Sequence, residues 1–236
     1  MFPTITEKNV LLDFRAASMI VMIVILTNGF TYALFNKSAA GAGISNANTE
    51  VTEQLYLLDQ ASVFVSDVDK FEKKVRKVSK KLSVPAEWLM AVMYSESKFD
   101  ASVSNHRGSG ATGLIQWMPT TAQDFDITVE KLRNLNHTEQ LDYVYDYLDR
   151  VRRKYKQYET LTELYLAILY PKAIGEDYCY TMYAQPSEAY KLNVGLDIDK
   201  DGRVTVKDID DRMKKMYPTA YMAEREAGSM WSFLGI

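Results

Sequence analysis

The sequence predicts a mainly α-helical domain that follows a single N-terminal membrane-spanning helix. From residue 68 onward, apolar residues recur at three- and four-residue spacings, as on one face of a helix, and few stretches alternate with a period of two. Residues 16–36 carry no charge, and this length matches the roughly 20 residues that a helix needs to cross a bilayer.

The uncharged run at residues 16–36 decides the expected compartment. Lys8 and Arg15 precede it, whereas only Lys37 follows closely before Lys70. This bias favours an N-terminus in the cytoplasm and a large C-terminal part outside it. We expect a retained membrane anchor. The alternatives are a signal peptide cleaved among the small residues that follow, and a segment that inserts from a larger particle.

The chain is expected to have five parts. Residues 1–15 form a short N-terminal segment ahead of the apolar run. Residues 37–54 are small and polar without an apolar period, which is typical of a flexible linker. Residues 55–192 form the helical domain, and residues 193–236 form a helical extension that contains an acidic loop.

Composition excludes several classes of protein. The net charge is −3, from 28 Lys and Arg against 31 Asp and Glu, so we expect no nucleic-acid partner. Cys179 is the single cysteine, which excludes an internal disulfide and a multi-cysteine zinc site. His106 and His137 are the only histidines, so a His-rich metal site is not expected either.

The helices of the domain follow from apolar spacing and from the prolines. Pro85 stands where a helix can begin, and Pro171 stops a later one. A loop rich in Gly, Ser and Asn separates the second helix from the third. The expected helices are residues 68–82, 85–97, a short one from 119, 141–151 and 161–170.

Glu96 is the candidate catalytic acid. It follows an apolar turn, residues 90–94 (MAVMY), so its carboxyl group enters a region that favours burial. Burial disfavours the ionised form and raises the pKa, so the group can hold a proton near neutral pH. A glycosidase needs such an acid, because the leaving sugar oxygen must be protonated as its bond breaks.

Two motifs around Glu96 resemble a known family. SESKFD at residues 95–100 and GATGLIQWMPTTA at residues 110–122 occur in the order and at the separation found in lytic transglycosylase domains of the soluble, goose-lysozyme-like type. The resemblance covers about residues 68–190. It implies a lysozyme-like helical fold and an enzyme that cleaves the glycan strands of peptidoglycan.

The resemblance also implies roles for individual residues. Glu96 matches the family's acid/base, and Ser97 matches a hydroxyl that positions this acid or the substrate. Met118 matches a residue near the floor of the cleft. The turn that lines the cleft and binds the sugar corresponds to Gly113, Leu114 and Gln116.

The third motif of the family, Ala-Tyr-Asn, is only partly present. Its tyrosine binds the catalytic carboxyl group, and Tyr170 matches it, but Leu169 and Pro171 replace the flanking residues. A half-buried core tyrosine is the alternative interpretation of Tyr170.

The sequence offers Glu96 no obvious second carboxylate. Asp100 is close in sequence, but its position favours a turn-capping role. We therefore expect substrate assistance: Glu96 cleaves the bond between N-acetylmuramic acid and N-acetylglucosamine, and the resemblance implies a 1,6-anhydro product. The alternatives are a muramidase that uses water and a non-catalytic peptidoglycan-binding or assembly module.

The acidic loop at residues 197–208 follows the calcium-loop template D-x-[DN]-x-[DN]-G-x5-E up to its last position, where an aspartate resembles the dockerin-type variant. Acidic side chains converge as Gly202 turns the chain, and a backbone carbonyl and a hydroxyl add oxygens. We expect a structural Ca²⁺, and an acidic turn without a metal is the alternative. The predicted ligands are Asp197, Asp199, Asp201, Arg203, Thr205 and Asp208.

The expected setting combines these features. Peptidoglycan is the expected partner, together with the membrane through residues 16–36. A host enzyme of the cell envelope and a component of a phage virion, each within a larger assembly, are both compatible with an anchor, a linker and a single lytic domain.

Overall fold

The structure is a computed structural model that describes residues 54–105 and 109–224. The chain divides into two compact units, Met1–Thr52 and Glu53–Ile236, and the described residues lie in the second. The predicted membrane segment at residues 16–36, nearly all of the linker and the end of the tail lie outside the described residues. Within the described part of the chain, no helix is both long enough and apolar enough to cross a membrane.

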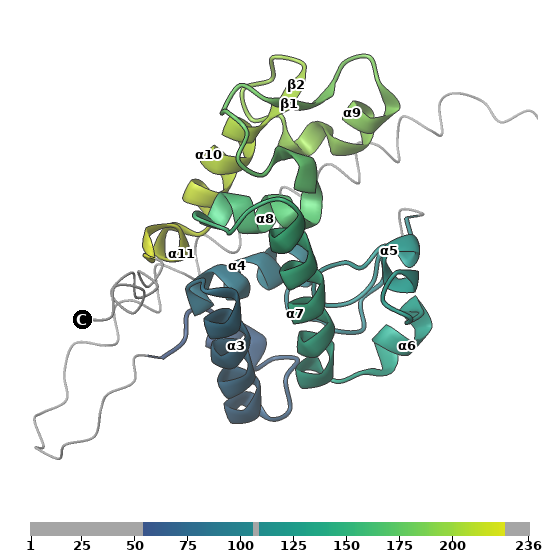
Figure 1. The fold of residues 1–236 in the computed structure, drawn as a ribbon, viewed down its shortest axis with the longest axis vertical. Helices are drawn as coiled ribbons and strands as arrows, with labels where there is room; N and C mark the ends of the chain where they lie inside the picture. The colour runs from purple at the N-terminus through teal and green to yellow at the C-terminus, as the bar shows by residue number, and fades with distance from the viewer. Residues whose placement is uncertain (1–53, 106–108, 225–236) are drawn as a thin grey trace, which may run out of the picture. The chain divides into compact units, whose positions relative to one another are not determined.

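The described residues form a mainly helical fold, which confirms the helical part of the predicted fold class (Figure 1). Two 3-10 turns, η1 (Pro171–Ala173) and η2 (Val194–Leu196), lie among the helices of the C-terminal half. The helices are α2 (Leu58–Ala61), α3 (Val68–Leu82), α4 (Ala86–Ser97), α5 (Pro119–Gln123), α6 (Val129–Asn134), α7 (His137–Lys154), α8 (Leu161–Leu169), α9 (Glu188–Asn193), α10 (Val206–Met216) and α11 (Pro218–Met222).

A two-stranded antiparallel sheet, which the sequence does not predict, includes part of the acidic loop. It pairs β1 (Thr181–Ala184) with β2 (Arg203–Thr205). Strands of three and four residues carry too short a pattern to be recognised by alternation. The sheet matters for the loop, because β2 leads directly into α10.

Helix α4 forms the centre of the domain. Five consecutive side chains of this helix, residues 89–93, are fully buried, so the helix is apolar on all its faces and needs neighbours all round. It contacts α3, α8 and α11, and α3 in turn runs beside α7 (Figure 1). The consequence for function is that the last turn of α4, which carries Glu96, emerges from the middle of the core.

The C-terminal extension packs into the same compact unit. Helix α10 contacts α8, and α11 contacts α4. Thr162 Oγ1 on α8 donates a hydrogen bond to Asp210 Oδ1 on α10, at 2.7 Å. Trp88 Nε1 on α4 donates to the carbonyl oxygen of Ala223, just beyond α11, at 3.1 Å. The extension therefore completes the packing around the two helices that carry the candidate site.

Candidate active site

Glu96 lies in the last turn of α4, one residue before the helix ends, and its side chain is partly buried. Burial raises the pKa of its carboxyl group from 4.5 to about 7. A hydrogen bond from Tyr165 and the positive charges of Arg212 and Lys98 act in the opposite direction. The direction and the main cause of the shift are those expected from the apolar turn that precedes Glu96.

Tyr165 is the tyrosine that binds Glu96. It lies in the middle of α8, is 5% exposed and hydrogen-bonds the Glu96 carboxyl group and the Ser95 hydroxyl. Burial is the largest of the causes that raise the pKa of its phenol, and the nearby Glu96 carboxylate adds to it. The phenol therefore stays neutral near pH 7 and can donate to the carboxylate. Sequence reasoning missed this residue, although a tyrosine inside an otherwise apolar helix was a signal for it.

Tyr170, the residue that the family resemblance led us to expect in this bond, has other neighbours in the structure. Tyr170 caps the end of α8, where its φ of −158° takes the chain out of the helix. Its ring packs edge-on against Tyr183, with centroids 5.6 Å apart, and its side chain hydrogen-bonds Tyr180. Tyr170 follows Tyr165 by five residues, which on a helix places the two side chains about 140° apart around the axis, on different faces. A contact between Tyr170 and substrate stays a prediction.

Ser97 joins the two motifs. Its buried Oγ lies 3.1 Å from the carbonyl oxygens of both Met93 and Leu114. The hydroxyl therefore ties the end of α4 to the turn that follows the loop. In this position Ser97 orients the backbone beside Glu96.

Gln140 holds the turn that the second motif forms. Gly113 has φ +80°, and a Cβ atom there would lie 2.6 Å from Gln140 Oε1. The same oxygen accepts a hydrogen bond from the Leu114 amide at 3.0 Å. Gln140 Nε2 donates to the carbonyl oxygens of Ala101 and Leu132. This fully buried amide was not predicted, and its only sequence signal is a polar residue next to the apolar face of α7.

The remaining residues of the turn differ in exposure. Leu114 is fully buried, so its side chain packs in the core, while its backbone makes hydrogen bonds with Ser97 and Gln140. Gln116 is partly exposed, and its Nε2 donates to the Gly113 carbonyl oxygen at 3.3 Å. Met118 is 44% exposed. Sugar binding by this turn stays a prediction for all of them.

Backbone strain is present in both motifs. Lys98 and Phe99, directly after the Glu96 turn, have φ of 56° and 68°, and Gln116 has φ of 52°. Left-handed backbone at a residue other than glycine costs on the order of 1–3 kcal/mol and is concentrated at functional sites. Four further non-glycine residues outside the motifs have the same left-handed backbone, so this feature accompanies the motifs but does not identify the site by itself.

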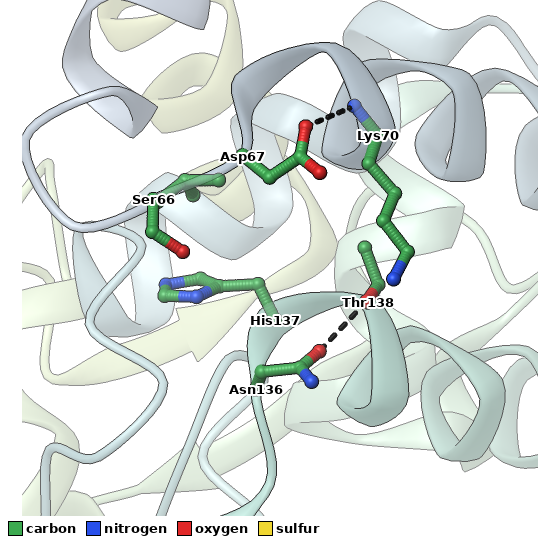
Figure 2. Close-up of a pocket in the computed structure, with 7 residues that line it drawn as sticks. Ser66, Asp67, Lys70, Asn136, His137 and Thr138 are labelled. Atoms are coloured by element: carbon green, nitrogen blue, oxygen red, sulfur yellow. Dashed lines mark hydrogen bonds between the residues drawn. The ribbon is translucent and has the colours of Figure 1, made fainter.

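A surface pocket lies where α3 and α7 begin (Figure 2). Asp67 Oδ1 accepts from the Lys70 amide at 3.0 Å, Thr138 Oγ1 donates to Asn136 Oδ1 at 2.7 Å, and His137 Nε2 lies 2.8 Å from the Phe99 carbonyl oxygen. None of these residues is among the groups that act on Glu96. Two of the residues that line this pocket, Asp67 and Asn136, cap the starts of α3 and α7.

The acidic loop brings together three of its predicted ligands. Carboxylate oxygens of Asp197, Asp199 and Asp208 lie within 4.8 Å of one another and could hold a metal ion. Asp197 is 7% exposed; its Oδ2 accepts from the Tyr190 hydroxyl at 2.6 Å and from the Gly202 amide at 3.0 Å. Its Oδ1 is buried and has no hydrogen-bond partner among the described residues. A buried, unpartnered carboxylate oxygen beside two further carboxylates fits a hard cation.

The other predicted ligands have different neighbours. Asp201 pairs with the Arg203 guanidinium, with Nη2 and Oδ2 2.7 Å apart, and is not in the three-carboxylate group. Thr205 caps α10, and its hydroxyl donates to Asp208 Oδ2 at 2.6 Å. Asp208 therefore belongs both to the acidic group and to the first turn of α10.

Arg212 is a residue of the site that sequence reasoning did not find. It lies on α10, and its charge acts on Glu96, Lys98, Tyr165 and Tyr217. The available signal was its spacing: it shares a helix face with the fully buried Ile209, three residues earlier.

The comparison with known families agrees with the geometry. Residues 73–168 match the family model described as Transglycosylase SLT domain. No curated protein matches the chain at a significant level. The matched region contains Glu96, the turn at residues 113–118 and Tyr165, whereas the acidic loop and Arg212 lie beyond it. Residues 73–168 are thus similar to transglycosylase SLT domains, which implies a lytic transglycosylase that acts on peptidoglycan outside the cytoplasm.

Proposed function

We propose that this protein cleaves the β-1,4 bond between N-acetylmuramic acid and N-acetylglucosamine, with Glu96 as its only acid/base. The observation that carries this proposal is the pKa of Glu96, about 7, beside a tyrosine hydroxyl in a region similar to transglycosylases. At neutral pH the protonated and ionised forms are both well populated, so one group can act as acid and then as base.

The proposed reaction balances without water. Glu96 gives its proton to the glycosidic oxygen as the bond to C1 of the muramic acid breaks. The neighbouring acetamido oxygen stabilises the positive charge that forms on that carbon. The Glu96 carboxylate then takes the proton of the C6 hydroxyl, whose oxygen bonds to C1 and closes the 1,6-anhydro ring. Tyr165 supports the intermediate step, because its hydrogen bond stabilises the carboxylate.

The surroundings of Glu96 favour substrate assistance over a second carboxylate. Among the described residues, the groups that act on Glu96 are the phenol of Tyr165 and two cations, and none is a carboxylic acid. Asp100 Oδ1 accepts from the amide and the hydroxyl of Ser102, at 2.8 and 2.7 Å, so it is engaged in a turn. Hydrolysis by water is the second candidate for the same site.

We further propose that the acidic loop holds a structural Ca²⁺. Three convergent carboxylates, one with a buried free oxygen, suit the oxygen-rich coordination that Ca²⁺ prefers. The Arg203 carbonyl group and Thr205 are the proposed additional ligands. Because Asp208 also caps α10, the ion would stabilise the start of that helix and supply no catalytic step.

The proposed setting is the cell envelope, with residues 16–36 as the anchor, or a virion that breaches the wall during entry. Association of the protein with membrane fractions or with purified virions separates the two. A start of the mature chain near residue 41 would show that residues 16–36 are cleaved.

Digestion of purified peptidoglycan tests the activity. The wild-type chain should release soluble glycan fragments, and Glu96→Gln should release none while it remains folded and bound to the polymer. Asp100→Asn is the matched control and should keep its activity. Full activity of Glu96→Gln would refute the proposal, and a wild-type chain that binds without cleavage would indicate a binding module.

A further inference from the structure

The C-terminal extension brings a positive charge to the active site. Arg212 lies on α10, more than forty residues beyond the region that matches transglycosylase domains. Helix α10 nevertheless packs against α8, which carries Tyr165, and the positive charge of Arg212 favours the ionised form of Glu96.

Contacts on both sides hold α10 in this position. Asp210, two residues before Arg212, accepts a hydrogen bond from Thr162 on α8 at 2.7 Å and from the Tyr221 hydroxyl on α11 at 3.1 Å. At the end of α10, the ring of Tyr217 packs edge-on against Tyr94 on α4, with centroids 6.4 Å apart. Arg212 is therefore fixed relative to the helices that carry Tyr165 and Glu96.

The guanidinium group of Arg212 is not fully used in hydrogen bonds to other parts of the protein. Its Nε is buried and has no hydrogen-bond partner among the described residues. In the same part of the chain, no carboxylate lies within ion-pair distance of it. A partly buried cation without a paired anion is costly, and such an arrangement is typical of sites where charge develops during a reaction.

We propose that Arg212 is a positioning residue, whose charge stabilises the carboxylate that Glu96 becomes after it has given its proton to the leaving sugar. This inference rests on the proposed function and deepens it, because it makes the C-terminal extension part of the active site. In the catalytic cycle, Arg212 stabilises the ionised Glu96 that exists between the acid step and the base step.

The other groups around Glu96 define what Arg212 contributes. Tyr165 faces it from α8, and Tyr217 lies where α10 meets α11. Lys98, directly after α4, is the second cation, and its Nζ lies 4.2 Å from the centroid of the Tyr94 ring. Both cations lower the pKa of Glu96, and Arg212 has the larger effect of the two.

A titration of Glu96 by NMR tests the proposal without relying on catalysis. The full-length protein is labelled with ¹³C-glutamate, and Glu96→Gln identifies the resonance. In Arg212→Gln the midpoint of the Glu96 titration should rise by about 0.5–1 pH unit, because an opposite charge is removed. Arg212→Lys should restore most of the shift. Lys215→Gln, an exposed cation near the end of the same helix, is the control and should leave the midpoint unchanged.

The activity profile provides a second measurement. The alkaline limb of the rate on purified peptidoglycan should move upward in Arg212→Gln by the same amount as the NMR midpoint. Arg212→Met serves as a second neutral variant if the first does not fold. A folded neutral variant with an unshifted Glu96 midpoint would overturn the role of Arg212. A shifted midpoint in a protein that cleaves no peptidoglycan would instead overturn the proposed function.

Discussion

The hydrogen bond from Tyr165 to Glu96 leads to the most specific prediction. In Tyr165→Phe the carboxylate loses a donor that stabilises its ionised form, so the pKa of Glu96 should rise above its value of about 7. A hydrogen bond to a charged group contributes about 1.5–3 kcal/mol. Since 1.36 kcal/mol corresponds to one pKa unit, the pKa of Glu96 should rise by about one to two units.

The assay for Tyr165→Phe is the rate of peptidoglycan solubilisation as a function of pH. The alkaline limb reports loss of the protonated acid, so it should move upward by about one to two pH units, with at least a tenfold lower maximal rate. Tyr170→Phe is the matched control, because Tyr170 bonds Tyr180 instead of Glu96. An unshifted limb in Tyr165→Phe, or the same shift in Tyr170→Phe, would refute this reasoning.

Three further predictions concern stability. The native pKa of Glu96, about 7, lies above the 4.5 of the free side chain, so the free energy of unfolding of the wild type falls as pH rises from 4.5 to 7. The free energy of unfolding of Glu96→Gln, measured with urea, should therefore exceed that of the wild type by about 3 kcal/mol at pH 8 and by almost nothing at pH 4. Gly113→Ala should lose about 2–4 kcal/mol, because its backbone is left-handed and its Cβ would meet a fixed amide oxygen. Asp197→Asn should abolish the rise in melting temperature that Ca²⁺ gives the wild type.

Each of these stability predictions has a control within the chain. Gly195→Ala should be nearly neutral, because nothing lies within 4 Å of the added Cβ. Asp201→Asn should keep the response to Ca²⁺, because that side chain pairs with Arg203 outside the three-carboxylate group. If neither Ca²⁺ nor a chelator changes the melting temperature of the wild-type protein, the proposal of a bound metal is contradicted. If the difference in free energy of unfolding between Glu96→Gln and the wild type is the same at pH 4 and pH 8, the raised pKa of Glu96 is contradicted.

Local pattern was sufficient to predict much of the fold. The helix predicted at residues 68–82 is α3, because its apolar spacing is regular and lysines mark the opposite face. Pro85 and Pro171 set the start of α4 and the end of α8 within one or two residues. Glu96 could also be found, since its position at the end of an apolar stretch is visible in the sequence alone.

The missed residues depend on contacts between distant segments. Tyr165 was passed over in favour of Tyr170, because the sequence does not show which face of α8 packs against α4 and meets Glu96. Gln140 acts on a turn 26 residues away, and Arg212 acts on an acid more than a hundred residues earlier in the chain. Periodicity places such residues on a buried face, but it gives no partner for them.

The mass of the products from purified peptidoglycan tests the central claim most directly. The wild-type chain should yield fragments that end in 1,6-anhydro-muramic acid, each lighter by one water than the fragment released by hydrolysis. Glu96→Gln should yield neither kind. Fragments with only reducing ends would contradict the transfer reaction, and either product from Glu96→Gln would contradict the assignment of Glu96 as the acid/base.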